Sequence, residues 1–209
     1  MSDAPFRFTV QASTCTSVAE IQQTARRAEE LGYHALTIAD HFDGQVGPLV
    51  SLAAAAQVTS TLRLGTLVLS NDYRHPVVLA KACATLDVLS EGRLLLGVGV
   101  GWLREEFEVL GVPFAGRGRR AEEYVAAMRA LWDDETASYT GDTVAFANAI
   151  SRPAPVNGRV PIIVGGHSDA AARRAGRFGD GFFPGKGDND RLRELITIMR
   201  HAAEDAGRD

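Results

Sequence analysis

Short apolar segments alternate strictly with segments of helical periodicity along this chain. Apolar runs of this length bounded by turn residues are typical of strands buried on both faces. We predict six strands, at residues 6–12, 33–39, 62–69, 93–98, 160–164 and 179–183. No hairpin joins successive core strands, so the sheet is expected to be parallel. Right-handed crossovers wind such units either into an open doubly wound sheet or into a barrel.

Local signals mark where several helices between these strands begin and end. Ser17 and Glu20 have the spacing of a capping box, in which each side chain satisfies a backbone N–H. Gly32 follows the first helix as a C-terminal glycine does. Pro76 stands at the first helical position, where a missing N–H costs nothing. Including those with weaker signals, we predict helices at residues 18–31, 49–60, 77–89, 119–132, 169–178 and 190–206.

The chain has 209 residues and six strand–helix units. A complete barrel of eight units takes about 250 residues. The sequence stops on residues 206–209, which look like the end of a helix. We therefore expect one domain, residues 1–209, that is either truncated or closed by another chain. Apolar strand edges left open in this way favour self-association, and we expect a possible homodimer.

Composition excludes several classes of protein. The net charge is −4 and the 22 Lys and Arg residues are scattered, which argues against a nucleic-acid partner. No apolar run approaches the roughly 20 residues of a membrane span. Cys15 and Cys83 lie in separate segments without metal-ligand spacing, so neither a disulfide framework nor a zinc site is expected. With no signal-peptide pattern, we expect a cytoplasmic protein.

The stretch from Gly92 to Trp102, GRLLLGVGVGW, ends a predicted buried strand in three glycines at alternate positions. Glycine lets a backbone approach a ligand because it has no Cβ. A glycine-rich turn needed only for tight packing is the alternative. The spacing differs from the dinucleotide fingerprint, whose third glycine lies one residue later. A Rossmann fold is therefore disfavoured.

Polar residues and glycines follow the predicted strands. These groups are Asp40-His41, Ser70-Asn71-Asp72, Gly99-Val100-Gly101-Trp102, Gly165-Gly166-His167 and Pro184-Gly185-Lys186. In a parallel barrel the strand ends converge on one face. Backbone N–H groups and Lys186 suit an anion, and His41 can move a proton, although it could also simply cap a strand end. The set predicts a site for a planar ligand that carries a phosphate.

Other polar residues are interpreted as structural. Glu105, Glu106 and Glu108 are expected to form a solvated helix start, and His75 to make structural hydrogen bonds in its loop. The sequence lacks a nucleophile elbow with Ser, His and Asp, and no strand carries a Schiff-base lysine. It also lacks a triad of metal ligands, so no metal site is predicted.

Three segments carry a family resemblance: ARRAEELGYHALTIADHF, LRLGTLVLSNDYRHPVVLAKACATLDVLSEGRLLLGVGVGWLREEFEVLGVPF and PIIVGGHSDAAARRAGRFGDGFF. On these segments the chain resembles the luciferase-like monooxygenase superfamily, specifically its deazaflavin (coenzyme F420)-dependent oxidoreductase branch. The resemblance covers most of the chain, and the middle segment is the most specific. It implies an α/β fold of the TIM type, a (β/α)8 barrel, here incomplete with about six units. It also implies an insertion after strand four, which accounts for the irregular residues 103–157.

The resemblance further implies which residues serve the cofactor. Family members carry a non-prolyl cis peptide in a bulge of strand three, which maps to Leu67-Val68. His41 is the implied catalytic residue, exchanging a proton beside the ring. The implied cofactor-binding residues are Asp40, Leu67, Val68, Val100, Gly101, Trp102, Gly165, Gly166, His167 and Lys186. Some deazaflavin members have Thr-Gly-Glu where this chain has Val100-Gly101-Trp102, so it lacks that acidic side chain.

The implied function is hydride transfer between F420 and a small organic substrate. In such enzymes the cofactor carries the redox chemistry and the protein positions the substrate and handles the proton. One alternative is an FMN-dependent monooxygenase of the same family. Another is a non-catalytic flavin-binding barrel. A phosphate-binding lyase or isomerase is a weaker alternative, because it needs a lysine or paired carboxylates at strand ends.

Overall fold

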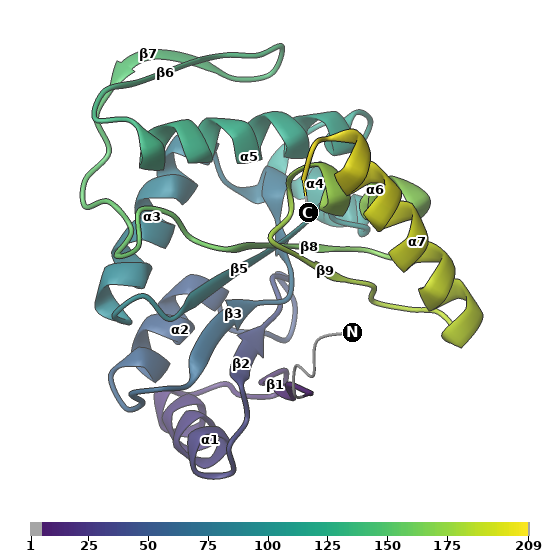
Figure 1. Ribbon diagram of the computed structural model, residues 1–209. Helices are drawn as coiled ribbons and strands as arrows, with labels where there is room; N and C mark the ends of the chain where they lie inside the picture. The colour runs from purple at the N-terminus through teal and green to yellow at the C-terminus, as the bar shows by residue number, and fades with distance from the viewer. Residues whose placement is uncertain (1–5, 209) are drawn as a thin grey trace.

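A curled parallel sheet forms the centre of the computed structural model, which describes residues 6–208. The strands run in the order β1, β2, β3, β5, β8, β9, and each neighbouring pair is parallel. Their bounds are β1 (Thr9–Gln11), β2 (Ala35–Ile38), β3 (Arg63–Thr66), β5 (Leu94–Gly99), β8 (Ile162–Gly165) and β9 (Gly181–Phe183). With helices on its outer side, the sheet forms half of a barrel (Figure 1). The predicted parallel α/β fold of the TIM type is confirmed.

The helices alternate with these strands. They are α1 (Val18–Glu30), α2 (Pro48–Ala56), α3 (Pro76–Leu89), α4 (Arg104–Leu110), α5 (Arg117–Asp133), α6 (Asp169–Phe178) and α7 (Asn189–Asp205). Ser17 caps α1 as predicted, because its hydroxyl accepts a hydrogen bond from the N–H of Glu20. The Glu20 carboxylate, however, accepts from the N–H of Thr16 at 2.7 Å. Pro76 occupies the first turn of α3, as its fixed φ favours.

Strand three is not the single strand predicted for residues 62–69. It is split into β3 and β4 (Leu69–Ser70) around a cis peptide at Leu67-Val68, the position that the resemblance implies. Leu64 pairs with Leu94 and Leu69 with Val98, so five residue steps on this strand match four on β5. The extra residue is a β-bulge, which bends a strand and leaves residues out of the ladder.

The insertion after β5, predicted as the irregular residues 103–157, is largely regular, and the predicted helix start at residues 105–108 belongs to α4. It contains α4 and the start of α5, followed by a hairpin of β6 (Ala137–Thr140) and β7 (Ala145–Ala149). A buried hydrogen bond of 3.1 Å from the indole Nε1 of Trp132 to the carbonyl of Ala80 fixes α5 on α3. The insertion is thus tied to the sheet through the helix that precedes β5.

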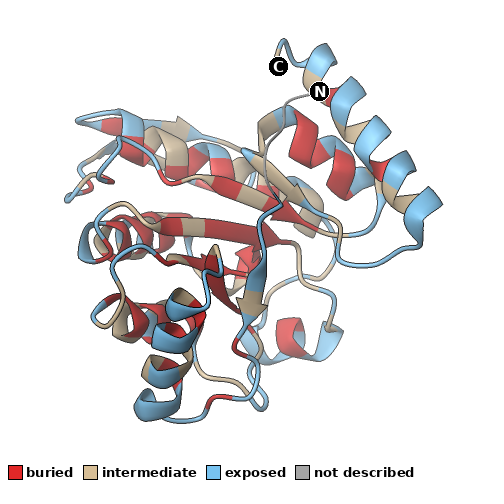
Figure 2. Ribbon diagram, turned by 60° about the horizontal axis from the view of Figure 1, so that its bottom comes forward, coloured by how far each residue is buried: buried red, intermediate tan, exposed pale blue. Residues whose placement is uncertain are grey.

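The strands and the inner sides of their helices consist largely of buried residues (Figure 2), and the apolar ones form one core cluster. Leu36, Leu64 and Leu96 on the strands and Leu52 and Leu79 on the helices are fully buried. Each such side chain contributes roughly 1.5–3 kcal/mol when it leaves water. Among helices in residues 6–208, none is long and apolar enough to cross a membrane.

A single carboxylate at the end of α1 holds the turn that leads into β3. Glu29 accepts hydrogen bonds from the N–H groups of Ser60, Thr61 and Leu62 and from the hydroxyl of Thr61, at 2.6–3.0 Å. Desolvation of the carboxylate opposes its ionisation, but these hydrogen bonds outweigh that effect and lower the pKa of Glu29 to about 2. The contact fixes where β3 enters the sheet.

We expect Glu29→Gln to lower the free energy of unfolding at pH 7 by about 1–2 kcal/mol, since solvent screening discounts the full pKa shift. The folded pKa lies below the ordinary value of 4.5. The contribution is therefore complete above about pH 4.5 and is lost as the pH falls through about 2. Urea unfolding at pH 7 and pH 3 measures this, with the exposed Glu30→Gln as control. A difference from wild type that is the same at both pH values contradicts the assignment.

Candidate functional site

His41, directly after β2, meets the residues that follow β5. Its imidazole lies edge-on to the indole of Trp102, with 5.9 Å between ring centroids and 78° between ring planes. The structure therefore brings together the predicted catalytic histidine and one of the predicted cofactor-binding residues. Both come from the carboxyl ends of parallel strands, where barrel enzymes place functional groups.

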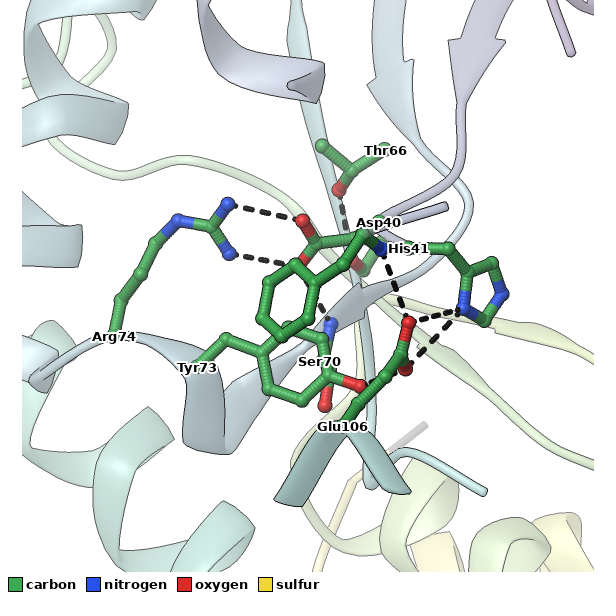
Figure 3. Close-up of polar contacts among 9 residues, drawn as sticks. Asp40, His41, Thr66, Ser70, Tyr73, Arg74 and Glu106 are labelled. Atoms are coloured by element: carbon green, nitrogen blue, oxygen red, sulfur yellow. Dashed lines mark hydrogen bonds and ion pairs between the residues drawn. The ribbon is translucent and has the colours of Figure 1, made fainter. Parts of the chain in front are cut away.

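Glu106 on α4 is buried, and its prediction as part of a solvated helix start is wrong. Its carboxylate lies 3.1 and 3.3 Å from Nδ1 of His41 and accepts a 3.1 Å hydrogen bond from the N–H of Phe42. The hydroxyl of Tyr73 donates to the same carboxylate (Figure 3). One feature of the sequence pointed to this burial. Glu106 stands next to the apolar Phe107 in the first turn of α4, and both residues are buried.

Hydrogen bonds determine the protonation states of Glu106 and Tyr73, which form a polar cluster with His41. Burial raises the pKa of a carboxyl group, but the hydrogen bonds from Tyr73, Phe42 and His41 prevail and lower the pKa of Glu106. Burial and the hydrogen bond to Glu106 raise the pKa of the Tyr73 hydroxyl far above its usual range. At neutral pH Glu106 is a carboxylate and Tyr73 is a neutral donor.

Asp40 is fully engaged by protein groups. Its two carboxylate oxygens accept from Arg74 at 2.7 and 2.9 Å, and the N–H of Ser70 donates to it at 3.1 Å (Figure 3). Its side chain is 4% exposed. A bidentate pair of this kind fixes geometry as well as charge. Asp40 therefore holds the loop that carries Tyr73, a role that the sequence did not indicate.

The strand-three bulge fits against glycines of β5 and β8. A Cβ built on Gly165 lies 2.4 Å from Cγ1 of Val68, and one built on Gly99 lies 2.5 Å from Cγ2 of Val68. At Gly97 a Cβ lies 1.9 Å from the carbonyl oxygen of Thr66. We name Val68 with Gly97, Gly99 and Gly165 the glycine notch. The side chain of Val68 occupies the space that side chains at Gly99 and Gly165 would need.

Gly101 allows the chain to turn from β5 into α4. Its φ is 70°, and a Cβ on it lies 2.6 Å from Cε2 of Phe107 and 2.7 Å from the hydroxyl of Ser70. The guanidinium of Arg117 donates to the Gly101 carbonyl at 3.2 Å. Positive charge therefore lies beside this turn, a feature the sequence analysis missed. Only glycine is accommodated at this position. The turn at Gly101 therefore determines where α4 begins and where Glu106 lies.

The remaining predicted residues lie along β8 and after β9. Gly166 has a φ of 143°, and its N–H donates to the carbonyl of Phe183. His167 is exposed, and its carbonyl accepts from Arg191 at 3.5 Å. Lys186 is exposed and makes no ion pair within residues 6–208. The structure thus joins β8 to the notch but does not bring Lys186 into contact with it.

Comparison with known proteins places this site in a family. The model of the luciferase-like monooxygenases matches residues 3–209. The chain belongs to the luciferase-like monooxygenase family. Uncharacterized protein Rv0953c of Mycobacterium tuberculosis is 39% identical over 171 residues, which cover 81% of this chain and 60% of that protein. The chain spans about 60% of the length of several of these curated relatives.

Two similar proteins have names that state a cofactor. F420-dependent glucose-6-phosphate dehydrogenase of Mycolicibacterium gilvum is 35% identical over 204 residues, which cover 91% of this chain and 60% of that protein. The solved structure of an F420-dependent secondary alcohol dehydrogenase with an F420–acetone adduct has a TM-score of 0.87 and 25% identity. That match covers 97% of this chain and 64% of the alcohol dehydrogenase.

The residues of this luciferase-like chain fit a flat cofactor with an anionic side chain. Gly99 and Gly165 make room for the side chain of Val68 at the strand ends, and His41 and the 69% exposed Trp102 provide aromatic rings. The guanidinium of Arg117 offers a positive charge that an anionic group can use. No group of three or more His, Cys, Asp or Glu side chains within residues 6–208 is arranged to hold a metal ion.

The close packing in the glycine notch predicts that larger residues there lower the free energy of unfolding. We expect Gly165→Ala to lower the free energy of unfolding by about 1–3 kcal/mol, because the added methyl group overlaps Val68. In a Val68→Ala background the same change is expected to cost less, since the overlapping methyl groups are gone. Urea unfolding of the wild type, the two single variants and the double variant gives the coupling free energy between positions 68 and 165.

Gly97→Ala serves as the matched comparison in this cycle. Its methyl group meets the backbone oxygen of Thr66, which Val68→Ala leaves in place. Its cost is therefore expected to persist in the Val68→Ala background. Equal rescue of both alanine variants contradicts the notch as described.

Proposed function

We propose that the chain belongs to an F420-dependent oxidoreductase that transfers a hydride between F420 and a small organic substrate. The two relatives named for F420 support the cofactor, and membership of the family supports the redox class. The observation that carries the proposal is the placement of His41, held by Glu106, beside the exposed Trp102 at the strand ends. When bound, the deazaflavin supplies the hydride-transfer chemistry.

The protein's part in this reaction is to position the reactants and to move a proton. A hydroxyl group that is oxidised, or a carbonyl group that is reduced, exchanges one proton along with the hydride. His41 is the group proposed to exchange it, because imidazole titrates near neutral pH and a general base works from within hydrogen-bonding reach. Trp102 lies edge-on to this imidazole and borders the site.

Contacts to the cofactor are proposed from the same strand ends. Leu67 and Val68 are proposed to lie behind the ring, at the bulge where the side chain of Val68 packs against Gly99 and Gly165. The other proposed contacts are Val100, Gly101, Trp102, Gly165, Gly166, His167 and Lys186. Asp40 is proposed to act on the cofactor through the loop it holds, because its carboxylate is already paired. A homodimer, a single domain and a cytoplasmic location stay predictions.

Binding of each cofactor to the purified chain tests the proposal directly. We expect F420 to bind at least tenfold more tightly than FMN, about 1.4 kcal/mol. Titration followed by fluorescence measures both affinities. Tight FMN binding without F420 binding reverses the assignment in favour of a monooxygenase.

The role of His41 is tested by His41→Gln, whose amide can still donate to Glu106. We expect kcat to fall by about 10²–10⁴, the range lost with a general acid or base, while F420 affinity changes little. Reduction of F420 is followed with glucose 6-phosphate and secondary alcohols, chosen from the names of the two relatives.

His201→Gln, on the exposed face of α7, is the control and is expected to match wild type. Undiminished turnover by His41→Gln contradicts the assignment. A wild-type chain that binds F420 and turns over none of the substrates favours the non-catalytic alternative.

A further inference from the structure

Glu106 is the one carboxylate within residues 6–208 that contacts the imidazole of His41. It comes from α4 in the insertion and not from a strand end. Its side chain is 10% exposed, against 28% for His41, so the carboxylate lies deeper than the imidazole. Such a group can act on a substrate only through the histidine in front of it.

The contacts of Glu106 decide which nitrogen of His41 carries a proton. An ionised carboxylate only accepts hydrogen bonds, so Nδ1 of His41 must be the donor. In the neutral imidazole the lone pair is then on Nε2, the nitrogen that points away from Glu106 (Figure 3). A partner that binds one ring nitrogen fixes the tautomer and the orientation of the ring.

Tyr73 and Phe42 keep the carboxylate in place for this task. The Tyr73 hydroxyl and the Phe42 N–H donate to it, and the two rings stack with 5.0 Å between centroids. Tyr73 also contacts Phe107 edge-on at 5.8 Å, so α4 is held on both sides of Glu106. With three donors directed at it, the carboxylate has little freedom to turn from His41.

We propose that Glu106 is a positioning residue that holds His41 as the Nδ1–H tautomer and leaves Nε2 free to exchange the proton with substrate. The part that concerns substrate rests on the function proposed above; the tautomer itself does not. Proton transfer therefore uses one nitrogen of one residue. Through Glu106, the insertion after β5 contributes to the chemistry.

Histidine NMR on the full cofactor-free chain tests the tautomer. With ¹⁵N-labelled histidine, two-bond ¹H–¹⁵N correlations distinguish Nδ1–H from Nε2–H, and His41→Gln identifies the His41 signals by their loss. We expect the Nδ1–H pattern for wild-type His41 above the pH at which it is protonated. An Nε2–H pattern in the wild-type chain overturns the proposal, and this result needs no variant to fold.

Variants at position 106 test whether Glu106 is the reason that His41 adopts the Nδ1–H tautomer. Glu106→Gln is expected to lose the pure Nδ1–H pattern, because the amide can donate to Nδ1 as well as accept from it. Glu106→Asp restores the pattern by keeping a carboxylate. Glu105→Gln, an exposed neighbour on α4, is the control and is expected to leave it unchanged. Retention of the wild-type pattern in a folded Glu106→Gln chain overturns the proposal.

The measurement separates this inference from the proposed function. If the chain does not bind F420 but shows an Nδ1–H pattern that depends on Glu106, the proposed function is refuted and the tautomer assignment is supported. F420-dependent turnover in a chain whose His41 is the Nε2–H tautomer removes the positioning role and leaves the function.

Discussion

Contact between the strand-three bulge and the glycines of its neighbours determines how the strand ends are arranged. Val68 touches positions on β5 and β8 that no larger residue than glycine can occupy. Because core packing leaves little free volume, a side chain at Gly97, Gly99 or Gly165 must push these strands apart. The corner at Gly101 continues the same strand, so the position of α4 depends on this contact as well.

The polar cluster is built on that framework from three segments. His41 lies in the loop after β2, Tyr73 in the segment after β4 and Glu106 on α4. The Asp40–Arg74 pair fixes the loop without entering the cluster, since its carboxylate has no free oxygen. A buried carboxylate is costly unless it is hydrogen-bonded, and that of Glu106 accepts hydrogen bonds from His41, Tyr73 and Phe42. These contacts hold the imidazole of His41 in one orientation at the carboxyl ends of the strands.

Features that depend on local sequence were predictable, and features that depend on tertiary contacts were not. Ser17 and Pro76 mark helix starts because a few neighbouring residues determine the cap. The bulge at Leu67-Val68 came from a family resemblance, since its apolar residues fit an unbroken strand equally well. Glu106 was taken for a solvated residue because three glutamates in four positions are typical of an exposed helix start. Its burial follows from contacts with residues more than thirty positions away, which periodicity does not encode.

The departure of this chain from some deazaflavin relatives has a structural consequence. Where the family resemblance implies an acidic residue in some members, this chain has the exposed Trp102, and the buried carboxylate of Glu106 lies four residues further on. That carboxylate is turned inward, onto His41, and is held there by Tyr73 and Phe42. A buried, fully hydrogen-bonded carboxylate cannot reach a substrate beside the imidazole. In the proposed function, proton exchange therefore falls to His41, and Glu106 determines which nitrogen performs it.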